Sequence, residues 1–340
     1  MNVIKRVLNW TCAGLLASLP LLGQAQGGAP QDLDALVKAA QAEGEVFFYS
    51  GVPEPALKRI ADAFKAKYGV TARFIRLPGN QVPVRYAVEA EAGNFAADLV
   101  LQAGDSVRYA EEGIKKGWFE PISAANIPAI KSGEFPAKMI TGPTAVVQII
   151  PWLIAFNTDA IKGADAPKDW RDMVNPKYKG RIILADPTSS DAFMVFWNVL
   201  LNAYGESFFT QLRAQNPRWQ SSGVPSIQAL AAGEGDIHFP AIPQQLTLTQ
   251  GKGAPIGGVK PEINTGIETH TLLTARAKAK HPNAARLLVH YIMTPEGNKV
   301  FNADPGGFSI YDTSTLPKGY VAPTLPDKAR QDQIVKLLGR

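Results

Sequence analysis

The sequence predicts an α/β protein with two lobes, each built on a doubly wound, mostly parallel sheet. From residue 31 onward, strand-like and helix-like segments alternate in short steps, which is the order of parallel βα units. Two long apolar extended segments, at residues 145–157 and near 257–273, are each long enough to leave one lobe and enter another. We therefore expect two lobes joined by these two segments as hinge crossovers.

The elements of the first lobe follow from periodicity and from their end signals. One apolar face spaced for a helix occupies residues 32–43, and Gly44 ends it. A second helix has Pro55 in its first turn and ends before Gly69. The other expected elements are strands at 45–49, 70–75 and 98–102 and helices at 82–93 and 106–116.

The second lobe has fewer and longer elements. Its expected strands lie at 181–185 and 236–239, with a helix at 192–204 between them. The tail contains three prolines and then a short helical pattern at 327–338, so we expect a wrapping segment. The predicted division is lobe 1 at 26–150 and 268–340, and lobe 2 at 151–267.

The first 25 residues have the pattern of a secretory signal peptide. Lys5 and Arg6 precede an apolar run, and Gly23 and Ala25 occupy the positions expected before cleavage. Cleavage after Ala25 removes Cys12, the only cysteine, and a lipid anchor there is disfavoured because its preceding residues lack the usual pattern. We expect an exported periplasmic protein that is stabilised by its core without disulfides.

Charge and hydropathy argue against a nucleic-acid-binding protein and against a membrane-spanning one. The net charge is +5, and loss of the two positive charges of the signal peptide leaves +3, spread among acidic residues without basic runs. No stretch after the signal peptide reaches the ~20 apolar residues of a membrane-spanning helix. Neither a nucleic-acid surface nor a membrane span is expected.

Seven short segments, in this order, resemble one family. They are 46–51, Ala96-Ala97-Asp98-Leu99-Val100, Ala155-Phe156-Asn157-Thr158, Tyr178-Lys179-Gly180-Arg181-Ile182 with Asp186-Pro187, Gly233-Glu234-Gly235, His281-Pro282-Asn283-Ala284-Ala285, and Thr294-Pro295-Glu296-Gly297. The chain resembles type II periplasmic solute-binding proteins, in the branch of ferric-iron, thiamine, polyamine and aminophosphonate receptors.

This resemblance implies a monomeric, non-enzymatic receptor without a cofactor. Such a receptor closes its lobes on a small molecule by a hinge motion and delivers it to an inner-membrane ABC permease. Relatives that hold iron directly use adjacent tyrosines with a histidine or carboxylate. The matching positions here are Pro243-Gln244, Val52-Pro53 and Ala103, so we expect no metal held by side chains, although a ferric receptor that uses exogenous anions stays an alternative.

The main predicted contact is the helix start at residues 186–192. Free backbone N–H groups there, with the hydroxyls of Thr188, Ser189 and Ser190, would hold a carboxylate or phosphonate. The alternative is an ordinary helix cap without a ligand. We expect a small organic anion or zwitterion as ligand.

Other loops should line the same cleft. Asp105 has two interpretations, since it could pair with an amine or cap the following helix. Trp152 could stack on the ligand or belong to the core. The remaining candidates are the loop residues Ser50, Gly51, Val52, Asn80, Ala103, Gly104, Ser222, Pro243 and Gln244.

Two other functions are consistent with most of these observations. A secreted hydrolase is possible in principle, but the nucleophile-elbow, zinc-protease and P-loop motifs are lacking. A receptor that signals to a membrane kinase would have the same fold as an importer's receptor, and the sequence does not separate the two.

Overall fold

The computed structural model describes residues 33–305, 307–314 and 316–340. The predicted signal peptide lies outside these residues. None of the helices that the structure describes is long and apolar enough to cross a membrane.

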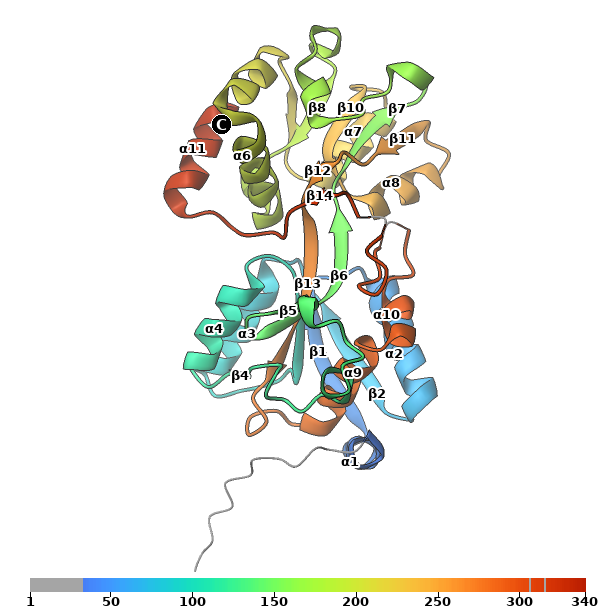
Figure 1. Cartoon of the computed structure of the whole chain (residues 1–340), viewed down its shortest axis with the longest axis vertical. Helices are drawn as coiled ribbons and strands as arrows, with labels where there is room; N and C mark the ends of the chain where they lie inside the picture. The colour runs from blue at the N-terminus through green and yellow to red at the C-terminus, as the bar shows by residue number, and fades with distance from the viewer. Residues whose placement is uncertain (1–32, 306, 315) are drawn as a thin grey trace, which may run out of the picture. The chain divides into compact units, whose positions relative to one another are not determined.

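A seven-stranded sheet forms the first half of the fold (Figure 1). Its strand order is β2-β1-β3-β13-β6-β5, and β4 pairs with β13. The strands are β1 (Glu45–Ser50), β2 (Thr71–Arg76), β3 (Leu99–Gln102), β4 (Phe119–Glu120), β5 (Ile140–Thr141), β6 (Thr144–Pro151) and β13 (Gly266–Thr274). The helices that belong with it are α1 (Leu33–Glu43), α2 (Glu54–Tyr68), α3 (Gln81–Glu91), α4 (Ser106–Lys115), α5 (Pro128–Lys131), α9 (Pro282–Ile292) and α10 (Pro295–Phe301).

Helices cover both faces of this sheet, as in a doubly wound fold. Phe48 and Leu99 point to one face, where they join a core with α1, α2 and α9. Their neighbours Tyr49 and Val100 point to the other face, where they pack with α3 and α4. This alternation follows from the period of two in a β-strand.

The second sheet has five strands in the order β11-β7-β10-β8-β9. Its strands are β7 (Leu153–Asn157), β8 (Ile182–Ala185), β9 (Arg218–Gln220), β10 (Ile237–Ala241) and β11 (Ile256–Val259). Its helices are α6 (Asp191–Ala214), α7 (Gly223–Ala231), α8 (Pro243–Gln250) and α11 (Lys328–Leu338), and a small separate pair joins β12 (Ile263–Asn264) to β14 (Gly319–Tyr320). Short 3-10 turns lie at Ala137–Met139, Gly163–Asp165, Trp170–Val174, Pro176–Tyr178 and Pro187–Ser189.

The predicted α/β class is confirmed, but both sheets are mixed. β1 pairs in parallel with β2 and β3, and β8 with β9 and β10. β13 runs antiparallel to β3 and β6, and β7 runs antiparallel to β10 and β11. The expectation of mostly parallel sheets is therefore wrong, because the crossover strands return in the opposite direction and insert beside the βα units.

One further element differs from the prediction. The crossover at 145–157 is two strands, β6 and β7, separated at Trp152, whose backbone N–H and C=O bond to the side chain of Asn264. The helix expected at 192–204 ends as predicted, because Gly205 has the non-helical backbone angles φ 70 and ψ -178. A second helical segment follows this kink and reaches Ala214 within α6.

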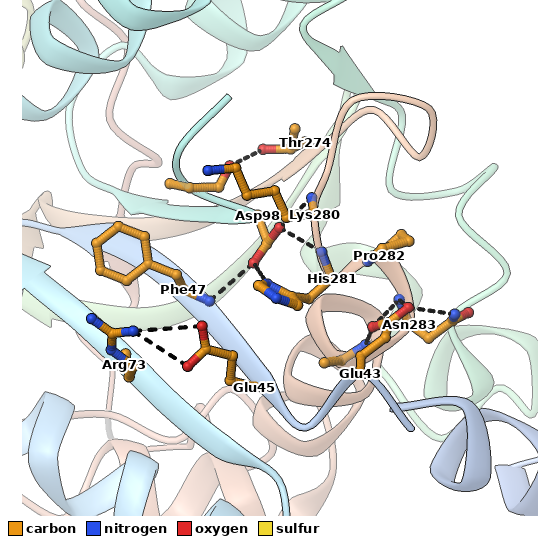
Figure 2. A network of polar contacts seen from close by, with 12 residues as sticks. Glu43, Glu45, Phe47, Arg73, Asp98, Thr274, Lys280, His281, Pro282 and Asn283 are labelled. Atoms are coloured by element: carbon orange, nitrogen blue, oxygen red, sulfur yellow. Dashed lines mark hydrogen bonds and ion pairs between the residues drawn. The ribbon is translucent and has the colours of Figure 1, made fainter. Parts of the chain in front are cut away.

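A buried carboxylate ties several segments of the first sheet together (Figure 2). Asp98 Oδ2 accepts hydrogen bonds from the backbone N–H of Phe47 at 3.0 Å and from Nδ1 of His281 at 2.9 Å. Its Oδ1 accepts from the backbone N–H groups of Lys280 at 2.8 Å and His281 at 2.9 Å. Three of the family-like segments, 46–51, 96–100 and 281–285, therefore meet here, and their shared role is structural.

Candidate functional site

A pocket of about 430 Å³ lies where elements of both sheets approach the β13 crossover. The start of α4 and its preceding loop line it with residues 104–108, and the start of α6 contributes Asp191, Ala192 and Val195. β13 contributes Gly266, Ile267, Glu268 and His270. The tail between β14 and α11 completes the lining with residues 322–325. Its volume falls in the range of small-molecule sites.

Acidic side chains outnumber basic ones around this pocket. Asp105, Glu111, Asp191 and Glu268 line it, whereas Arg108 is the one Lys or Arg among its described lining residues. Arg108 Nε lies 2.5 Å from Asp105 Oδ2, and its other nitrogen Nη1 lies 2.8 Å from Glu112, outside the lining. The positive charge of Arg108 is therefore already compensated, and the pocket favours a ligand that carries positive charge.

Asp191 responds to this acidic environment. Burial raises the pKa of its carboxyl group, and the negative charge of Asp105 raises it further, while Arg108 opposes the shift. Two carboxylates from α6 and from the loop before α4 thus repel each other at the pocket. A positively charged group placed between them would relieve this repulsion.

Two titratable residues of β13 form the buried side of the pocket. Glu268 is 8% exposed and His270 is 4% exposed. Burial raises the pKa of Glu268, which is partly offset by a hydrogen bond from Tyr320, and burial lowers the pKa of His270 to about 4. His270 is therefore neutral at pH 7.

The helix start predicted to bind an anion has fewer free donors than expected. The Ala192 N–H donates to the hydroxyl oxygen of Ser190, and the N–H groups of Phe193 and Met194 donate to its carbonyl oxygen. The expectation of free amides at this helix start is wrong for these three groups, because Ser190 caps the helix itself. The carboxylate of Asp191, in the first turn, also adds negative charge where an anion was expected.

The hydroxyls predicted to assist there are engaged locally. Thr188 donates to the carboxylate of Asp186 at 2.6 Å, and Ser189 donates to the carbonyl oxygen of Asp186 at 2.7 Å. The strand and the helix are joined by a 3-10 turn over Pro187–Ser189, which Asp186 caps. A ligand role for these residues stays a prediction.

The predicted loop before α4 does reach the pocket. Gly104 and Asp105 line it, and Ala103 precedes them. The alternative interpretation of Asp105 as a helix cap is wrong, since its side chain makes no capping hydrogen bond and pairs with Arg108 instead. Gly104 has φ 91, and a Cβ there would lie 3.8 Å from the Asp191 carboxylate.

The loops after β1 and β2 contact each other. The buried Ser50 hydroxyl accepts a hydrogen bond from the Val52 N–H, and a Cβ on Gly51 would lie 3.1 Å from the Cα of Gly79. Asn80 is exposed at the start of α3 and makes no side-chain cap. None of these predicted residues is among the described residues that line the pocket.

The candidates from the second sheet also lie outside the pocket lining. Trp152 is buried and stacks on Phe193 at 5.4 Å between ring centroids, within a hydrophobic core. Pro243 and Gln244 begin helix α8 and do not form the expected loop, and Ser222 precedes helix α7. Their ligand roles stay predictions.

Sequence reasoning missed Glu268, His270 and the tail residues 322–325. Glu268 and His270 had one usable signal, because polar residues at i and i+2 share one face of a strand and here interrupt an apolar crossover. The tail residues had none, because their position depends on long-range contacts. Among the residues that the structure describes, no group of three or more potential His, Cys, Asp or Glu metal ligands gathers.

Comparison with known proteins supports one assignment. The family of bacterial extracellular solute-binding proteins matches residues 46–304. An uncharacterised protein of Haemophilus influenzae is 25% identical over 276 residues, which cover 78% of each chain.

Solved structures share the fold at low identity. The substrate-binding protein of an ABC transporter from Agrobacterium tumefaciens has a TM-score of 0.69 and 14% identity, covering 87% of this chain and 93% of that one. Iron-bound HitA from Pseudomonas aeruginosa has a TM-score of 0.64 and 18% identity, covering 87% and 98%. These similarities confirm the predicted two-lobed, type II binding-protein fold. Together with the family match over most of the chain, they identify this chain as a member of the bacterial extracellular solute-binding proteins.

Proposed function

We propose that this protein is the periplasmic receptor of an ABC importer and binds a small organic zwitterion in the pocket beside β13. The carrying observation is that one pocket is lined from α4, from α6 and from the β13 crossover. A ligand held there contacts elements of both sheets, so its binding can drive closure about the crossovers. The exported location and the predicted lobe boundaries belong to the same proposal, except that helix α11 of the tail packs onto α6 beside the second sheet and so belongs with lobe 2.

The charges of the pocket favour a zwitterion over a simple anion. Arg108 is the one Lys or Arg among the pocket's described lining residues, and it pairs with Asp105. The other acidic side chains of the lining, those of Glu111, Asp191 and Glu268, therefore have no Lys or Arg partner within it. A carboxylate or phosphonate alone would add repulsion to this site. An ammonium group would instead compensate the acids, while Arg108, whose guanidinium has five N–H donors, can still donate a hydrogen bond to the negative end of the ligand although its charge is compensated.

Screening the mature protein, from residue 26, by thermal shift and calorimetry tests the proposal. The probes are γ-aminobutyrate, aminomethylphosphonate, butyrate, malate, spermidine and ferric citrate. We expect a zwitterion to stabilise the protein, by about 2.7 kcal/mol at a hundredfold excess over Kd. Mass spectrometry of the recovered probe should find it unchanged, as reversible binding requires.

Three outcomes would contradict the proposal. Stabilisation by ferric citrate alone would favour an iron receptor that uses an exogenous anion. Conversion of the bound probe would favour a secreted hydrolase. Stabilisation by butyrate or malate with no response to either zwitterion would contradict the ligand class.

A further inference from the structure

Glu268 presents one unsatisfied oxygen beside the pocket. Its Oε1 accepts a hydrogen bond from the Tyr320 hydroxyl at 2.9 Å. Its Oε2 lies 3.7 Å from Nε2 of His270, which is too far for a hydrogen bond. Tyr320 belongs to β14, so the C-terminal tail holds this carboxylate in place.

The contacts of Thr144 favour one tautomer of His270. The Thr144 hydroxyl donates its single hydrogen to the carbonyl oxygen of Thr141 at 2.9 Å. The same oxygen lies 2.9 Å from Nδ1 of His270 and, when its own hydrogen points to Thr141, it accepts the hydrogen of that nitrogen. Neutral His270 therefore carries its proton on Nδ1, and Nε2 is an acceptor.

Glu268 Oε2 and His270 Nε2 together form what we call the acceptor pair. Both residues line the pocket, and no described residue donates a hydrogen bond to either atom. Two acceptors that face each other across a pocket are costly to bury when no donor lies between them. His270 is neutral, whereas Glu268 carries a negative charge that a positively charged donor would compensate.

We propose that the acceptor pair binds the primary ammonium group of the transported solute. This inference rests on the proposed function and specifies which atoms recognise the ligand. An ammonium group has three hydrogens and no acceptor, so it can donate to both atoms at about 2.9 Å while compensating the carboxylate. A hydroxyl has one hydrogen and no charge, so it can satisfy only one member of the pair.

Matched probes that differ only in the amine test this assignment. The pairs are γ-aminobutyrate with butyrate and aminomethylphosphonate with methylphosphonate, measured by calorimetry on the mature protein. We expect the amine of at least one pair to bind at least tenfold more tightly than its counterpart. Glu268→Gln should weaken that binding roughly ten- to a hundredfold, the range for a hydrogen bond to a charged group.

Glu262→Gln is the matched control, because Glu262 lies in the same crossover, is hydrogen-bonded to the Lys318 N–H and does not line the pocket. It should leave amine binding within about twofold. Nitrogen-15 NMR of the unsubstituted protein gives a second readout that needs no variant. His270 should have its proton on Nδ1, and the Nε2 resonance should move when the amine binds.

The outcomes separate this inference from the receptor function. Equal binding of an amine and its counterpart, undiminished amine binding by Glu268→Gln, or a proton on Nε2 of free His270 would each overturn the acceptor pair and leave a solute receptor standing. Failure of all four probes and of the wider screen to bind would overturn both.

Discussion

Replacing Asp98 with alanine should lower the free energy of unfolding by about 3 kcal/mol. The fully buried carboxylate accepts hydrogen bonds from three backbone N–H groups, those of Phe47, Lys280 and His281, and from the imidazole of His281. Alanine removes every acceptor and leaves the three backbone donors without partners. Each unsatisfied donor costs about 1 kcal/mol at the lower end of the usual range, which suits these partly buried groups.

Asp98→Asn should fall between wild type and alanine. The amide keeps one acceptor oxygen, but its NH₂ group faces two of the former donors, so roughly half of the stabilisation should be lost. The order of the three proteins separates two explanations. If alanine lost stability only through the cavity that it leaves, Asp98→Asn would keep nearly the stability of wild type, because the two side chains have nearly the same volume.

Urea unfolding followed by circular dichroism measures this series, and hydrogen exchange locates the loss. Exchange should accelerate in β1 and at the start of α9, where the donors lie. Asp62→Ala is the control, since Asp62 is exposed and pairs with Lys58 on the helix surface; it should cost less than 1 kcal/mol. An Asp98→Ala protein within 1 kcal/mol of wild type would refute the reasoning.

Three further outcomes are expected. Gly297→Ala should destabilise by about 2–3 kcal/mol, because its Cβ would lie 1.9 Å from the carbonyl oxygen of Tyr291. Ile334→Ala should cost about 2–4 kcal/mol, since this fully buried side chain packs α11 onto α6. Unfolding free energy should fall as pH drops from about 6.5 to 4, because burial lowers the pKa of His238, His270 and His290 to about 4 and only the unfolded chain takes up their protons in that window.

Each outcome has its own check in urea unfolding. Gly79→Ala meets nothing within 4 Å and should stay within about 0.5 kcal/mol, so equal losses at both glycines would contradict the steric argument. Exposed Lys336, on the same helix as Ile334, should likewise tolerate alanine. His238→Gln should make the pH dependence between 4 and 6.5 shallower, since His270 and His290 still contribute, and an unchanged slope would exclude His238 as one of its sources.

Local periodicity determined most of the first sheet. The predicted β1, α2 and β2 segments lie within one or two residues of the observed elements. The apolar stripe of α2, including Ile60 and Phe64, is buried as its spacing predicts. These elements are set by contacts between neighbours along the chain, which a sequence displays directly.

Strand direction at the crossovers was less accessible. The lengths of the two apolar segments indicated that the chain passes between lobes, but β6 and β13 pair antiparallel. Nothing in their composition fixes that direction, because apolar strands of either orientation look alike. Only the return of the chain into the first sheet decided it.

The pocket shows the same division. The loop with Gly104 and Asp105 was predicted, because loops that follow strands collect at one sheet edge. The acceptor pair was not, because it depends on Thr144, Tyr320 and β13 meeting across more than fifty residues of chain. The sequence alone determined the α/β class and the family resemblance through local pattern, whereas tertiary structure decided which polar atoms face the pocket, since each hydrogen bond is used or left open only when distant segments pack together.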